Sequence, residues 1–102
     1  MASIKMRLLS EFHKPLSDET IVPLEVLQSI PLETCPLLVH IDAYGDTIFN
    51  RSQMEVIISE IESLLNSSRQ FSLEERIFLD DLRRLCILGD VGPHRYLWIK
   101  GM

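Results

Sequence analysis

The residues best able to do chemistry in this sequence lie in one stretch, from His40 to Asp46. His40, Asp42 and Asp46 combine an imidazole with two carboxylates, the groups that serve as general acids and bases and as ligands of a metal ion. His40 and Asp42 share a face only where the segment is extended, and a metal held by these three groups alone would want further ligands. A small metal-dependent enzyme or regulator that uses these residues is therefore the alternative interpretation.

Other catalytic templates are missing from the sequence. It contains no Gly-x-Gly-x-x-Gly, no Gly-x-x-x-x-Gly-Lys-Ser/Thr, no Gly-x-Ser-x-Gly and no Cys-x-x-Cys. Its four glycines, at 45, 89, 92 and 101, are too sparse for a phosphate-binding loop. We therefore expect a protein that is not an enzyme and has neither a cofactor nor a bound metal.

The same stretch also has the composition of a binding site. Tyr44-Gly45-Asp46-Thr47 indicates a tight turn in which Gly45 supplies a positive φ, and Asp42 and Asp46 bracket it. One interpretation is an elaborate helix entry with Tyr44 partly buried. The other is an exposed acidic and aromatic surface formed by Asp42, Tyr44 and Asp46, because aromatic anchors among charges are typical of binding hot spots.

Charge extends this second interpretation to the helix that follows. The chain of 102 residues has 10 Lys+Arg and 15 Asp+Glu, a formal net charge of −5, which argues against nucleic acid and anionic membranes as partners. Glu55, Glu60 and Glu62 are expected on the outer side of the helix, close to Asp42 and Asp46, while most cations fall elsewhere. The predicted partner-binding residues are Asp42, Tyr44, Asp46, Glu55 and Glu62, and the expected partner is a basic protein surface.

The segment His40-Ile41-Asp42-Ala43-Tyr44-Gly45-Asp46-Thr47-Ile48-Phe49-Asn50 resembles His-Ile-Asp-Pro-Tyr-Gly-Asp-Thr-Val-Phe-Asn, a stretch found before a helix in small bacterial proteins. Those proteins also end in an aromatic strand, as Tyr96-Leu97-Trp98 does here. The resemblance covers residues 36 to 65 and, more loosely, the C-terminus. It implies an immunity or partner protein of the kind found beside bacterial toxins, and it assigns no residue a role.

Two helices with clear boundaries must position this stretch. Asn50 with Gln53, and Ser72 with Glu75, have the spacing of capping boxes, and apolar residues follow each at helical period. We expect helices over 51–65 and 73–88, packed as an antiparallel hairpin, with Gly89 ending the second. The apolar set of the second comprises Leu73, Ile77, Phe78, Leu79, Leu82, Leu85 and Cys86, and an ion pair is expected between Asp80 and Arg84.

Strands are expected near both ends of the chain. Residues 4–8 alternate apolar and cationic, and residues 95–100 are aromatic and β-branched, which predicts a last strand buried on both faces for much of its length. The residues between allow only short elements, because prolines recur at 15, 23, 31 and 36; one short helix is expected over 24–29 with Pro23 at its first position. Tyr96 and Trp98 pack in the core or form an interface, including a homodimer through an edge strand.

The sequence thus predicts a single α+β domain over residues 1–102, with a small antiparallel sheet that includes both terminal strands and packs against a two-helix hairpin. No apolar run approaches a membrane span or a signal peptide, and Cys35 and Cys86 are expected to be buried, reduced thiols in a cytoplasmic protein. The favoured function is non-catalytic protein binding, with neutralisation of a cognate bacterial toxin as its specific form. A structural subunit of a larger complex is a third interpretation.

Overall fold

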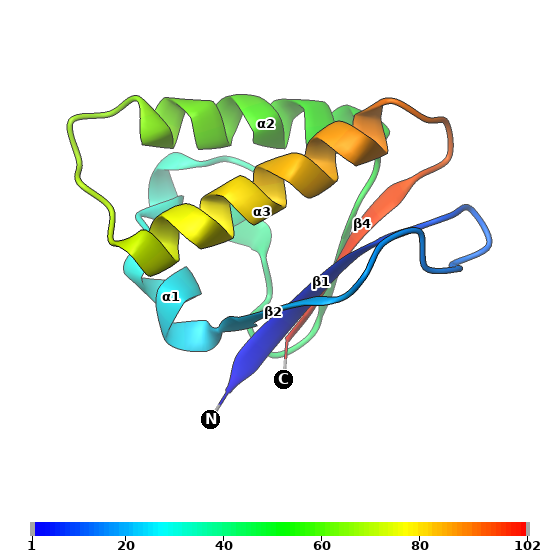
Figure 1. Ribbon diagram of the computed structural model, residues 1–102, viewed down its shortest axis with the longest axis horizontal. Coiled ribbons are helices and arrows are strands. Elements are labelled where there is room, and N and C mark those ends of the chain that lie inside the picture. The colour runs from blue at the N-terminus through cyan, green and yellow to red at the C-terminus, as the bar shows by residue number, and fades with distance from the viewer. Residues whose placement is uncertain (1, 102) are drawn as a thin grey trace.

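The computed structural model describes residues 2–101, which form a four-stranded antiparallel sheet with helices on one face (Figure 1). The sheet has the order β2-β1-β4-β3, so the two terminal strands are its central pair. This confirms the predicted α+β class. The elements are β1 (Ser3–Leu9), β2 (Thr20–Pro23), α1 (Leu24–Ser29), two single-turn 3-10 helices (Leu32–Thr34 and Leu38–His40), β3 (Asp46–Phe49), α2 (Arg51–Leu65), α3 (Leu73–Asp90) and β4 (Tyr96–Gly101).

Both long helices begin at the predicted capping boxes. Asn50 Oδ1 accepts the backbone N–H of Gln53 at 2.9 Å while Gln53 Oε1 accepts that of Asn50 at 2.8 Å. Ser72 and Glu75 form the same reciprocal pair at the start of α3. The prediction of 51–65 for the first helix is confirmed. α3 contacts both central strands and α2 packs along α3, so the hairpin rests on the sheet mainly through α3.

The predicted end of the second helix is wrong, because α3 continues through Gly89 to Asp90. Gly89 is buried, and a Cβ built there would lie 2.6 Å from Met54 Cε on α2 and 3.2 Å from Leu8 Cδ2 on β1. The glycine therefore allows α3 to approach its neighbours closely and does not terminate the helix.

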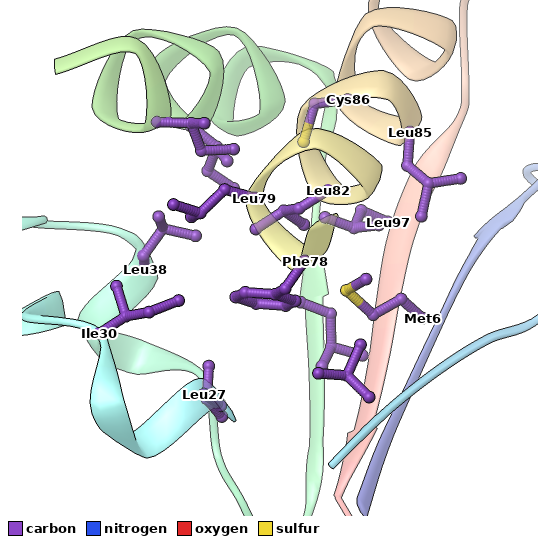
Figure 2. Close-up of a cluster of buried hydrophobic side chains, with 14 of the residues drawn as sticks. Met6, Leu27, Ile30, Leu38, Phe78, Leu79, Leu82, Leu85, Cys86 and Leu97 are labelled. Atoms are coloured by element: carbon purple, nitrogen blue, oxygen red, sulfur yellow. The ribbon is translucent and has the colours of Figure 1, made fainter. Parts of the chain in front are cut away.

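The core lies between the sheet and the helices. Figure 2 shows Phe78 of α3 between Leu27 of α1 and Met6 of β1, and all three side chains are buried. The inward face of the sheet contributes Ile4, Met6, Leu8, Leu97 and Ile99.

The predictions for two apolar segments, β4 and the start of α3, need correction. β4 is buried on one face only: Leu97 and Ile99 are fully buried, whereas Tyr96 and Trp98 are half-buried on the face that no helix covers within residues 2–101. β4 is also a central strand, so its backbone is not available for pairing with a second copy. Leu73 and Ile77 of α3 are exposed, because they lie beside the stripe that packs on the sheet.

The middle of the chain contains the strand β2, which the sequence did not predict: only short elements were expected there, and the one assigned was the helix over residues 24–29. β2 is stable as a strand because it pairs with β1, a contact that no local pattern reveals. The short helix over residues 24–29 is confirmed as α1, but Pro23 is its N-cap rather than its first residue, since Pro23 closes β2. Within residues 2–101, no helix has the length and apolar character needed to cross a membrane.

Candidate functional site

The stretch from Asp42 to Asp46, which we call the Tyr44 turn, is fixed by its own hydrogen bonds and by the sheet. Asp42 Oδ1 accepts the backbone N–H of Tyr44 at 2.9 Å, and Asp42 N–H donates to Thr47 Oγ1 at 2.9 Å. The N–H of Gly101 on β4 donates to the carbonyl of Gly45 at 2.7 Å. The turn is therefore an Asx-turn attached to the C-terminal end of a central strand.

One prediction about this turn is wrong, and one of its two interpretations is excluded. Gly45 does not have a positive φ. A glycine is needed there for space, because a Cβ at this position would lie 2.6 Å from Oδ2 of Asp42. Tyr44 is not partly buried, since its exposed fraction is 76%. The turn contacts β4 through its backbone, so the tyrosine ring remains in solvent, and the side chains of Asp42 and Asp46, two residues away on either side in the chain, are exposed as well.

The five predicted binding residues do not form one surface. Asp42, Tyr44 and Asp46 lie together at one end of β3, whereas Glu55 and Glu62 belong to α2, which begins beyond its other end (Figure 1). Glu55 and Glu62 are exposed and seven residues apart, so they lie on the same side of that helix. Two separate acidic sites thus replace the single surface that the sequence indicated.

Cations also interrupt the acidic character of the sheet beside the turn. Asp46 of β3 lies opposite Lys100 of β4, and Lys100 lies opposite Lys5 of β1. Arg7 lies near Glu19 at 3.4 Å and lines, with Asp46 and others, a hollow of about 340 Å³ on the open face of the sheet. The expectation that the cations fall elsewhere is therefore wrong for β1 and β4, because strand pairing brings both chain ends next to Asp46.

Ion pairs neutralise part of the helical surface as well. Arg83 of α3 lies 3.5 Å from Glu62 of α2. Arg84 pairs with Asp81 at 3.2 Å, and the predicted pair with Asp80 is not formed. Side chains three and four residues apart on a helix are both neighbours, so helical spacing alone does not decide between the two aspartates.

Glu60 was expected on the outer side of the helix, and this is wrong. Its exposed fraction is 8%, and its carboxylate accepts the backbone N–H groups of Leu37 and Leu38 at 3.1 Å each. These donors belong to the first turn of the 3-10 helix Leu38–His40, so Glu60 satisfies them where no side chain of that turn caps it. Glu60 therefore has a structural role that the sequence analysis missed. Its burial could have been inferred from the apolar residues at 57, 61 and 64, which lie next to it on the helix surface.

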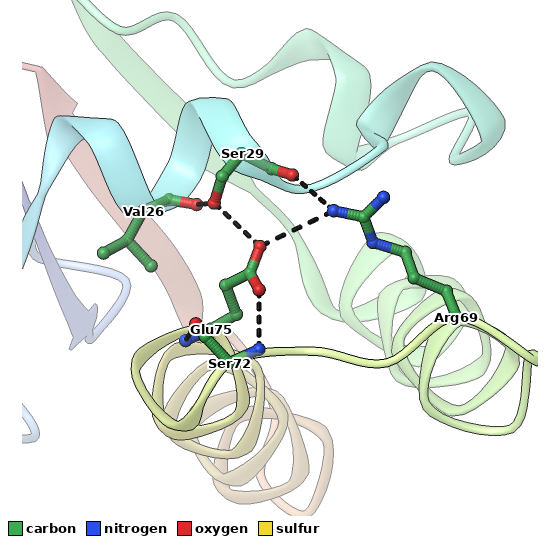
Figure 3. Close-up of polar contacts among 5 residues, drawn as sticks. All are labelled: Val26, Ser29, Arg69, Ser72 and Glu75. Atoms are coloured by element: carbon green, nitrogen blue, oxygen red, sulfur yellow. Dashed lines mark hydrogen bonds and ion pairs between the residues drawn. The ribbon is translucent and has the colours of Figure 1, made fainter.

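Glu75 is the second buried carboxylate and links three segments (Figure 3). Its oxygens accept the N–H of Ser72 at 2.7 Å and the hydroxyl of Ser29 at 2.8 Å, and Arg69 lies 3.7 Å away. The hydrogen bond from the Ser72 backbone, followed by that from Ser29, lowers the pKa of the Glu75 carboxyl below its usual value. This network joins α1 to the start of α3 and is part of the fold.

The groups expected for chemistry do not assemble into a reactive site. His40 ends the 3-10 helix Leu38–His40 and is not in the extended conformation that would place it beside Asp42. Among residues 2–101, no three His, Cys, Asp or Glu side chains converge as a metal site requires. Cys35 and Cys86 are buried and free, and burial raises the pKa of both thiols, that of Cys86 to about 12.

Comparison with protein-family models, with curated proteins and with solved structures finds no match to this chain. The arrangement at the Tyr44 turn therefore has to be interpreted from its own geometry. It offers an aromatic ring in solvent, a backbone held by the sheet, and two flanking carboxylates.

Proposed function

We propose that this protein is a non-catalytic protein-binding module and that the Tyr44 turn is its main contact surface. The observation that carries the proposal is the 76% exposure of Tyr44 on a backbone that is fixed by Asp42 and by Gly101. A tyrosine has only two side-chain torsions to order, so a ring on a rigid turn loses little entropy when a partner covers it.

Charge favours a basic partner. Asp42 and Asp46 flank Tyr44 in the sequence and are exposed, and the net charge of −5 speeds encounter with a cationic surface at low ionic strength. Because Lys100 and Lys5 follow Asp46 across the sheet, the acidic contact centres on Asp42 and Tyr44. The specific activity we propose is neutralisation of a cognate bacterial toxin by covering its basic cleft, with Glu55 and Glu62 as a separate contact. The sequence resemblance of residues 36 to 65 supports this choice.

The proposal requires a toxin gene adjacent to the gene for this protein, and the absence of such a gene would count against toxin neutralisation. The experiment uses the product of that gene, produced as an inactive variant. Its affinity is measured by calorimetry for the wild type, Tyr44→Ala, Asp42→Lys and a control, Phe12→Ala. Phe12 is a matched control because its exposure is 75% and it lies in the β1–β2 connection, beyond the other end of the sheet. We expect Tyr44→Ala to lower affinity about 30-fold and Phe12→Ala to leave it unchanged.

Equal affinities of Tyr44→Ala and the wild type would place the interface elsewhere. A photo-crosslinking amino acid at position 44 gives an independent readout, because a bound partner must then be cross-linked at that position. Circular dichroism of each variant separates loss of binding from loss of fold.

A further inference from the structure

A groove lies between β2, α1 and α3, on the opposite edge of the sheet from β3 and the Tyr44 turn. Its volume is about 300 Å³. Apolar residues and carboxylates line it together, and they include Val22, Val26, Phe78, Glu25, Glu74 and Asp81. We call it the β2–α3 groove.

Uncovered apolar side chains continue from the groove. Ile77 on its α3 side is 51% exposed, and Leu73, four residues earlier on the same helix, is 74% exposed. Ile21 of β2 is 61% exposed. Residues four apart on a helix are neighbours, so Leu73 and Ile77 form a continuous apolar strip at the groove, a feature that marks contact surfaces.

The charge of the groove has one sign. Glu25, Glu74 and Asp81 line it, and no Lys, Arg or His does. Asp81 pairs with Arg84, whereas Glu25 and Glu74 have no ion-pair partner among residues 2–101. An occupant that buries apolar side chains here must bring cations to these two carboxylates, because desolvating an unpaired carboxylate is costly.

The backbone of β2 favours an extended occupant. Leu24 N–H donates to the carbonyl of Ala2. In an antiparallel pair every second residue is hydrogen-bonded to the neighbouring strand, so Val22 is bonded to β1 and Ile21 is not. The N–H and C=O of Ile21 therefore point to the free edge of the sheet. Pro23 has no N–H, which limits main-chain pairing to a short stretch and leaves the groove to supply most of the contact.

We propose that the β2–α3 groove binds an extended segment of a partner protein that presents both apolar residues and lysine or arginine at every second position, so that both kinds of side chain face the groove. The apolar side chains of the segment enter the groove, and its cations pair with Glu25 and Glu74. The groove is separate from the Tyr44 turn, so an experiment can contradict the proposal for one site without affecting the proposal for the other.

The test uses a defined probe, a nine-residue fluorescent peptide in which lysine and valine take turns at every second position, with threonine at the positions between them. Its affinity is measured by anisotropy for the wild type, for the double variant Glu25→Gln/Glu74→Gln and for the control Glu11→Gln/Glu33→Gln. Both double variants remove two exposed carboxylates and change the net charge equally. We expect the groove variant to weaken binding about fivefold and the control variant to change it little.

Amide NMR shifts locate the peptide, and we expect them at residues 21–26 and 73–81. A separate variant, Ile77→Ser, should weaken binding without a change of charge, and Tyr44→Ala should not affect it. Equal loss in both double variants, shifts centred on another surface, equal binding of a glutamate–valine peptide, or no binding at millimolar concentration would each overturn the proposal.

Discussion

The buried carboxylate of Glu60 on α2 accepts the backbone N–H of Leu38 at 3.1 Å, across 22 residues of sequence. The same carboxylate accepts the N–H of Leu37, so one side chain of α2 holds the proline-rich segment against the helix. That segment leads directly to the Tyr44 turn, and Glu60 therefore contributes to the stability of the structure that precedes the proposed binding site.

Replacing Glu60 should destabilise the protein. Glu60→Ala leaves the N–H of fully buried Leu38 without an acceptor, and we expect a loss of about 2–3 kcal/mol in the free energy of unfolding, with a smaller loss for Glu60→Gln. Urea titration followed by circular dichroism measures both. Glu55→Ala, an exposed substitution on the same helix, should stay within about 0.5 kcal/mol of the wild type, and an equal loss there would contradict the assignment.

The lowered pKa of Glu75 predicts how stability depends on pH. The folded pKa lies below the value of 4.5 expected in the unfolded chain, so the stabilisation is complete above that value and is lost as the pH falls through the folded pKa. Glu75→Gln should cost about 1–2 kcal/mol at pH 7, and its difference from the wild type should shrink below pH 4.5. Thermal melts from pH 7 to pH 3 measure this; a constant difference would refute the role of ionisation.

Gly101 should be sensitive to the addition of a single methyl group. A Cβ at this position would overlap the backbone carbonyl of Ala43 and lie 2.6 Å from the backbone nitrogen of Tyr44. We expect Gly101→Ala to displace the Tyr44 turn, which amide NMR shifts of residues 42–47 would show, and to weaken partner binding. Gly92→Ala is the control, because its Cβ meets only the flexible end of the Arg95 side chain, and it should leave those shifts in place.

The two thiols should be inert in the folded protein. Burial raises the pKa of Cys86 to about 12, and that of Cys35 is raised as well, so at pH 8 neither has an appreciable thiolate population. Mass spectrometry should find no alkylation by iodoacetamide under native conditions and two additions in guanidinium chloride. Rapid labelling of the native protein would show that one of the thiols is accessible.

The long helices could be predicted from the sequence because their signals are local. The Asn50–Gln53 and Ser72–Glu75 boxes act within four residues, and each places the start of its helix correctly. The Tyr44 turn was also recognised, since Asp42 and its partner Tyr44 are two residues apart. Gly89 shows the limit: its local signal indicated a helix end, whereas close contact with Met54 determines its role.

The candidate site depended on contacts between distant residues. Glu55 and Glu60 have the same side chain on the same helix, yet one is exposed and the other is bound to Leu37 and Leu38. Likewise, strand order brings Lys100 beside Asp46, which divides the acidic surface that composition suggested.

The sequence by itself determined the α+β class, the long helices and their caps, because hydrophobic period and capping act over a few residues. Only the tertiary structure decided the sheet order, the burial of Glu60 and Glu75, and the exposure of Tyr44, Leu73 and Ile77. The physical reason is that burial and pairing depend on which distant segments pack together, and the residues on either side of a position in the chain do not specify that.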